Sequence, residues 1–120
     1  MDYQKWLDCT WSDPKEYKDF EAQMMEDAQA QLEAQGLKVV KTLPNQYLFG
    51  IVAGTADGRK WLHITISDVR EGDAWFKNVK LRRMSSERDW KGDEFHYCAW
   101  DELGAAVLKY MGDEYDDEIL

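Results

Sequence analysis

The sequence has few cysteines, few prolines and no long apolar run. Its two cysteines, Cys9 and Cys98, lie far apart and form no CxxC unit, so neither a disulfide framework nor paired zinc ligands are predicted. The longest nearly apolar run, residues 48–54, is far shorter than the ~20 residues that a membrane-spanning helix needs. The first residues carry acid where a signal peptide carries base, and no apolar stretch follows. We therefore expect a reduced, cytoplasmic protein with no membrane association.

The sequence also lacks the motifs of the common enzyme classes. Gly50 and Gly54 fall in a segment without the spacing of a Walker or dinucleotide loop, and among 24 carboxylates no acid–base pair stands out. We therefore expect a non-catalytic protein without a metal or cofactor. The alternative is a thiol or metal-dependent enzyme that uses His96 and Cys98, which lie two apart on a predicted strand and hence on one face.

Acid outweighs base in the chain as a whole. The formal net charge is -9, which favours solubility and repels phosphate backbones and anionic lipids. The composition therefore favours a protein partner with a basic surface over DNA, and it leaves homo-oligomerisation open.

What the chain does contain is a large set of core-forming side chains. Its apolar content is 44%, with six Trp, six Tyr and four Phe, and 120 residues support one core. No repeat or linker divides the sequence. We expect a single α+β domain over residues 1–112, followed by an acidic C-terminal tail over residues 113–120.

A long amphipathic helix is the most clearly indicated element. Asp13 followed by Pro14 predicts a helix start, because Asp accepts from unpaired N–H groups and Pro fits the first turn. Apolar residues then recur every three or four positions until a stop at Gly36. The apolar positions are Tyr17, Phe20, Met24, Ala28 and Leu32.

Asp57-Gly58 predicts a two-residue hairpin turn of type I′ between two strands. One side of this hairpin is apolar and is expected to face the core, while the reverse side is more polar and half-solvated. The expected core pairs are Phe49–Ile66, Ile51–Ile64 and Ala53–Leu62, and the expected reverse pairs are Gly50–Thr65 and Val52–His63.

The remaining segments complete the sheet and add a second helix. Residues 37–43 form a first strand, residues 74–84 a fourth and residues 95–99 a short fifth, and a final helix begins near Asp101. The sequence therefore predicts an α+β domain of order α-β-β-β-β-β-α, with an antiparallel sheet of four to five strands and both helices on one face.

Basic residues gather in residues 70–91 of this acidic chain. The segment has a local balance of +3, which leaves -12 for the remainder. Aromatic side chains interleave with these bases, a mixture that single-stranded nucleic-acid binders use for stacking and phosphate neutralisation. The alternative is that the segment only neutralises the acidic first helix or the acidic tail. Its bases are Arg70, Lys77, Lys80, Arg82, Arg83, Arg88 and Lys91, and its acids are Glu71, Asp73, Glu87 and Asp89.

These observations favour a non-catalytic adaptor or regulatory module that binds another protein. A nucleic-acid-binding module that uses residues 70–91 is the alternative, and the enzyme that uses His96 and Cys98 is the third hypothesis. We expect no catalytic and no metal-binding residue. The candidate binding residues are Trp61, His63, Phe76, Lys80, Arg82, Arg83 and Trp90.

Overall fold

The computed structural model describes residue 6 and residues 13–45, 48–66, 74–86, 88–90 and 95–111. Cys9, the turn at residues 71–73 and the acidic tail at residues 113–120 lie outside the described residues. Along the chain, the elements are α2 (Pro14–Ala34), β1 (Leu37–Asn45), β2 (Leu48–Thr55), β3 (Trp61–Thr65), α3 (Ala74–Lys77), β4 (Val79–Met84), β5 (His96–Cys98), the 3-10 helix η2 (Trp100–Glu102) and α4 (Leu103–Lys109).

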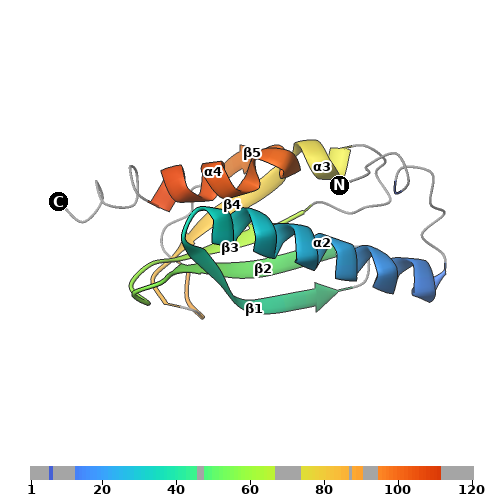
Figure 1. Cartoon of the computed structure of the whole chain (residues 1–120), viewed down its shortest axis with the longest axis horizontal. Coiled ribbons are helices and arrows are strands. Elements are labelled where there is room, and N and C mark those ends of the chain that lie inside the picture. Colours follow the sequence, from blue (N-terminus) through green and yellow to red (C-terminus); the bar gives the residue numbers. More distant parts are fainter. Residues whose placement is uncertain are drawn as a thin grey trace.

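The strands form one antiparallel sheet in the order β1-β2-β3-β4-β5, so every strand pairs with its neighbours in the chain. The two longer helices, α2 and α4, lie side by side on the same face of this sheet (Figure 1). The predicted fold class is therefore confirmed, including the number of strands and the side on which the helices pack.

The first helix begins and ends as its sequence predicts. The Asp13 carboxylate accepts a hydrogen bond of 2.9 Å from the backbone N–H of Lys15, and Pro14 occupies the first turn. Gly36 follows the helix with a φ of 76°, a conformation that favours glycine. The predicted apolar stripe is the buried face of α2: Tyr17, Phe20, Met24, Ala28 and Leu32.

The predicted register between β2 and β3 is confirmed, although the turn that joins these strands differs from the prediction. The backbone N–H of Gly58 donates to the Thr55 carbonyl, so the turn spans residues 55–58 and not 56–59. Asp57 accepts from the backbone N–H of Arg59 at 3.1 Å, and Gly58 takes a φ of 71°. The observed pairs are Gly50–Thr65, Ile51–Ile64, Val52–His63 and Ala53–Leu62.

The predicted fourth strand is partly wrong, because residues 74–77 form the short helix α3 and the strand begins only at Val79. Trp75 and Phe76 are adjacent and apolar, so this segment does not alternate as a half-buried strand does. It is also too short to show the apolar period of a helix. The helix also changes the direction of Phe76, which packs against the core.

One face of the sheet and the two helices enclose the core. Trp100 anchors α4 on α2, since its indole N–H donates to Asp27 at 2.6 Å while Gln31 donates to the Trp100 carbonyl at 2.9 Å. Gly104 lies so close to α2 that a Cβ atom there would collide with the backbone carbonyl of Gln31. The predicted core residues of the sheet are all buried: Phe49, Ile51, Ala53, Leu62, Ile64 and Ile66.

Truncation of Ile64 tests this core. Ile64 is fully buried, so Ile64→Ala should lower the free energy of unfolding by ~2–5 kcal/mol, the usual cost of a core cavity. Leu108 is 41% exposed on α4, and Leu108→Ala is the matched control, with an expected change within about 0.5 kcal/mol. Urea denaturation measures both variants. A loss below about 0.5 kcal/mol for Ile64→Ala would place this side chain outside the core.

Candidate functional site

The face of the sheet opposite α2 and α4, here called the outer face, carries most of the candidate binding residues. Strand alternation directs residues to this face from each strand, because neighbours in the ladder share a side. The pairs Val52–His63, His63–Arg82, Thr65–Lys80 and Lys80–Tyr97 place these side chains on one surface, to which Trp61 and Met84 also belong.

Cations and aromatic rings alternate across this face. The imidazole of His63 meets the Trp90 ring edge-on, with centroids 4.6 Å apart. The guanidinium carbon of Arg82 lies 4.3 Å from the Trp90 centroid and 5.2 Å from that of Phe95, and the Lys80 ammonium lies 4.4 Å from the Phe95 centroid. Each cation is therefore within the range of cation–π attraction. We call these five residues the aromatic-cationic row.

The rings of this face are open to solvent to an unusual degree. Trp90, Phe95 and Tyr97 are 45%, 40% and 61% exposed. Of the five large apolar side chains that are exposed in the described residues, these three and Leu43 belong to the outer face, and only Leu108 lies elsewhere. Single exposed apolar residues are ordinary, but a group on one surface indicates an interaction site.

The outer face is cationic although the protein is acidic. Lys38 and Lys41 of β1 share the face with Lys80 and Arg82, since they pair with Gly54 and Val52 of β2. Among the described outer-face positions of the five strands there is no carboxylate. The net charge of -9 therefore does not describe this surface.

His63 lies among the positively charged side chains of the outer face. Burial of its ring lowers its pKa to about 4, and the positive charges of Arg82, Lys41 and Lys80 lower the pKa further in the same direction. Its Nδ1 atom is 2.9 Å from the hydroxyl oxygen of Thr65. His63 is therefore neutral at pH 7, and the Lys and Arg side chains alone supply the positive charge.

The outer face of β3 is partly solvated, as the sequence predicts, but the outer face of β2 is covered at its middle. Val52 at its centre is fully buried, between its ladder neighbours Lys41 and His63. Long side chains from adjacent strands shield the middle of the face.

Two of the candidate residues lie apart from the outer face. Arg83 has the opposite strand parity to Arg82, is only 2% exposed, and places its guanidinium carbon 5.1 Å from the ring centroid of Tyr110. Phe76 packs against the core from α3. The other five lie together on the outer face or against it: Trp61, His63, Lys80, Arg82 and Trp90.

Sequence reasoning missed Phe95, Tyr97 and Lys41 as members of this face. The necessary pattern was present, because a strand that directs His96 and Cys98 to one side directs Phe95 and Tyr97 to the other. Lys41 was less accessible to prediction, since an irregularity in β1 between Val39 and Lys41 shifts the parity of this strand.

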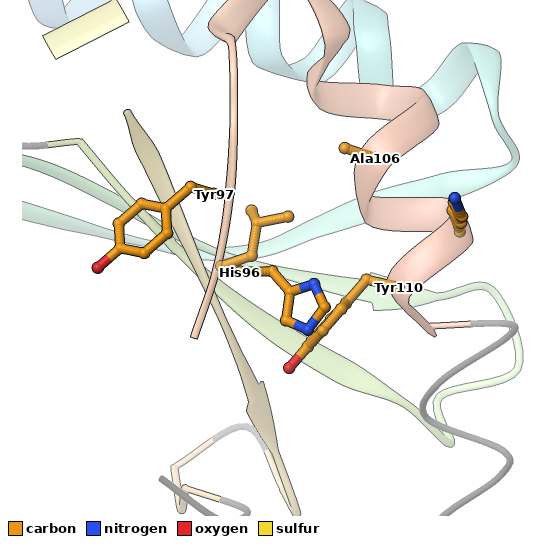
Figure 2. Close-up of a pocket in the computed structure, with 6 residues that line it drawn as sticks. His96, Tyr97, Ala106 and Tyr110 are labelled. Atoms are coloured by element: carbon orange, nitrogen blue, oxygen red, sulfur yellow. The ribbon is translucent and has the colours of Figure 1, made fainter. Parts of the chain in front are cut away.

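His96 and Cys98, the residues of the enzyme hypothesis, lie on the core side of β5. Figure 2 shows His96 beside Tyr110 of the last helix, with ring centroids 4.1 Å apart, and Tyr97 directed to the other side of the strand. The adjoining cavity of about 170 Å³ is also lined by Leu81, Ala106 and Lys109.

Burial raises the pKa of Cys98 to about 11, and the negative charges of Glu102 and Asp101 raise it further. At neutral pH the side chain is therefore the thiol and not the nucleophilic thiolate. No group of three or more His, Cys, Asp or Glu side chains in the described part of the chain is arranged to hold a metal ion. The enzyme hypothesis gains no support from this geometry.

No protein-family model, no curated protein and no solved structure matches the chain. None of the helices in the described ranges is long and apolar enough to cross a membrane.

The pKa of His63 tests the field of this face. We expect an NMR titration of its imidazole to give a pKa near 4, because the protonated ring would be partly buried among three cations. Between pH 6.5 and 4 the unfolded chain binds a proton that the folded protein does not bind. The His63 contribution to stability is thus complete above about pH 6.5 and decreases as the pH falls.

Arg82→Gln should raise the pKa of His63, because it removes the positive charge that lowers this pKa most, whereas Lys109→Gln on α4 should leave that pKa unchanged. A pKa of 6.5 or higher in the wild-type protein would show that the cations of the outer face do not act on His63.

Proposed function

We propose that this protein is a non-catalytic interaction module that binds an extended anionic chain across its outer face. The observation that carries the proposal is the aromatic-cationic row, in which Lys80 and Arg82 lie against exposed rings at positions without carboxylates. Tyr and Trp rings and Arg side chains are the groups that most often dominate binding energy at protein surfaces.

An extended ligand suits the dimensions of the row. The row extends from His63 on β3 over β4 to Phe95, which directly precedes β5. Neighbouring strands are ~4.8 Å apart, so its residues spread over about 10 Å across the sheet and further along the strands. A chain with repeated negative charges can contact Lys80 and Arg82 at the same time.

The electrostatic situation of His63 supports an anionic ligand. The positive charges of Arg82, Lys41 and Lys80 all act on its partly buried ring and lower its pKa, so the ring lies in a positive potential. Negative groups of a ligand would be attracted to this positive potential, and the partial burial of the site would strengthen the attraction.

A second candidate function keeps the partner that the sequence favours, a protein with a basic surface. Asp19, Glu26 and Glu33 are exposed on α2 at intervals of seven residues, which places them on one stripe of the helix. This stripe is directed away from the sheet, so it would form an interface separate from the outer face.

Three labelled 12-residue probes distinguish these candidates: oligo-deoxythymidine, polyglutamate and polylysine. We expect at least one of the two polyanions to bind, and Arg82→Glu to weaken that binding by at least about tenfold, as expected for the loss of a charged hydrogen bond. Lys109→Glu is the matched control, because it makes the same charge change on α4 and should alter the affinity by less than twofold.

Two results would contradict the proposal. One is that neither polyanion binds. The other is that polylysine binds and that Glu26→Lys abolishes this binding while Arg82→Glu does not, which would assign the interaction to α2. Thermal unfolding of each variant checks that its fold is retained.

A further inference from the structure

We propose that the anionic chain bound by the outer face is a single-stranded nucleic acid, with its bases stacked on the exposed rings and its phosphates at Lys80 and Arg82. This inference rests on the proposed function and specifies the class of its ligand. An acidic protein segment is the competing ligand, and the experiment below includes it.

The exposed rings favour nucleic acid over an acidic peptide. Carboxylates would use only the cations, but the face also presents Trp90, Phe95 and Tyr97 to solvent. Tyr97 is the most exposed of the three and is directed away from the last helix (Figure 2). Every nucleobase has an apolar π-face that stacks on such rings, and this stacking is the main sequence-independent contact of single-stranded nucleic-acid binders.

The positions of the cations relative to the rings suit a chain that alternates bases and phosphates. The guanidinium carbon of Arg82 lies 4.3 Å from the ring centroid of Trp90 and 5.2 Å from that of Phe95. The Lys80 ammonium lies 4.4 Å from the Phe95 centroid. A base stacked on either ring therefore has a cation beside it.

Only an unpaired strand can use this arrangement. In a duplex the π-faces of the bases are covered by their stacking neighbours, and recognition requires an element that enters a groove. The outer face is a sheet surface, and in the described residues both longer helices lie on its other side (Figure 1). The exposed rings and the lack of a described helix on this face thus favour single strands over duplexes.

The largest group of acids in the described residues lies on α2, on the far side of the sheet from the aromatic-cationic row. A helix layer packs about 10 Å from a sheet, and the solvent side of the helix adds about 5 Å, so the acidic stripe is at least about 15 Å away. The Debye length at physiological ionic strength is about 8 Å. The acids of α2 therefore contribute little to the potential that a phosphate at Lys80 and Arg82 would experience.

The test measures affinities for labelled 12-mers of deoxythymidine and uridine, for the corresponding duplex with deoxyadenosine, and for polyglutamate, at about 0.1 M salt. We expect both single strands to bind more tightly than the duplex and the peptide. The slope of log affinity against log salt should have a magnitude of about 1.4, since each phosphate contact of a single strand contributes ~0.7 and two cations take part. Arg82→Gln should reduce that magnitude by ~0.7.

Ring variants test the stacking contacts directly. Tyr97→Ala should weaken binding about 5- to 150-fold, the range measured for one base–ring stack, whereas Tyr97→Phe should retain it because the ring remains. Leu108→Ala is the matched control, since it removes an exposed apolar side chain from α4, and it should leave the affinity unchanged. Tyr97 is 61% exposed, so its truncation should not affect folding, which thermal unfolding checks.

Each outcome decides between the ligands. Single-strand binding with the expected dependence on Tyr97 and salt supports the inference. Tighter binding of polyglutamate or of the duplex, or an unchanged affinity in Tyr97→Ala, would overturn it while the proposed anion-binding function stands. Failure of every polyanion to bind would overturn both.

Discussion

The antiparallel pairing of β3 with β4 is the interaction on which both faces of this protein depend. In one register it joins Ile64 to Leu81 on the core side and His63 to Arg82 on the outer side. A shift of one residue would exchange the faces of a strand, and it would place charged side chains in the core. Burial of the apolar face therefore also fixes the positions of the cations and rings on the other face.

The two faces of the sheet divide the charge of the protein between them. The acidic helix α2 covers the core side, and α4 is held against it by Trp100, Asp27 and Gln31 and by the close approach at Gly104. This packing keeps both helices on one side. The outer face is left with Lys and Arg among aromatic rings, and this separation by face, rather than the total charge, determines which partners can approach.

The sequence predicts those parts of the fold whose local and long-range patterns agree. The register between β2 and β3 was predictable because apolar alternation in both strands and the glycine at residue 58 all support one pairing. The helix at residues 74–77 was not, because four residues are too few to establish a period.

The candidate site was predictable only in part. Lys80, Arg82 and Trp90 were identified from the composition of one segment, but composition cannot assign a side of the sheet. Arg83 was included with Arg82 for this reason, although adjacent strand residues are directed to opposite faces and Arg83 is buried against Tyr110. The contributions of Phe95 and Tyr97 depend on the pairing of β4 with β5, which brings together residues about 17 positions apart in the chain.

The central claim is that the outer face is the binding surface, and NMR chemical-shift mapping on the ¹⁵N-labelled protein tests it most directly. Titration with a deoxythymidine 12-mer should shift the indole N–H of Trp90 and the backbone amides of Lys80, Arg82 and Tyr97, because these groups line the aromatic-cationic row or adjoin it. The amides along the exposed stripe of α2 should not move. Shifts confined to α2 or α4, with the outer face unaffected, would contradict the account.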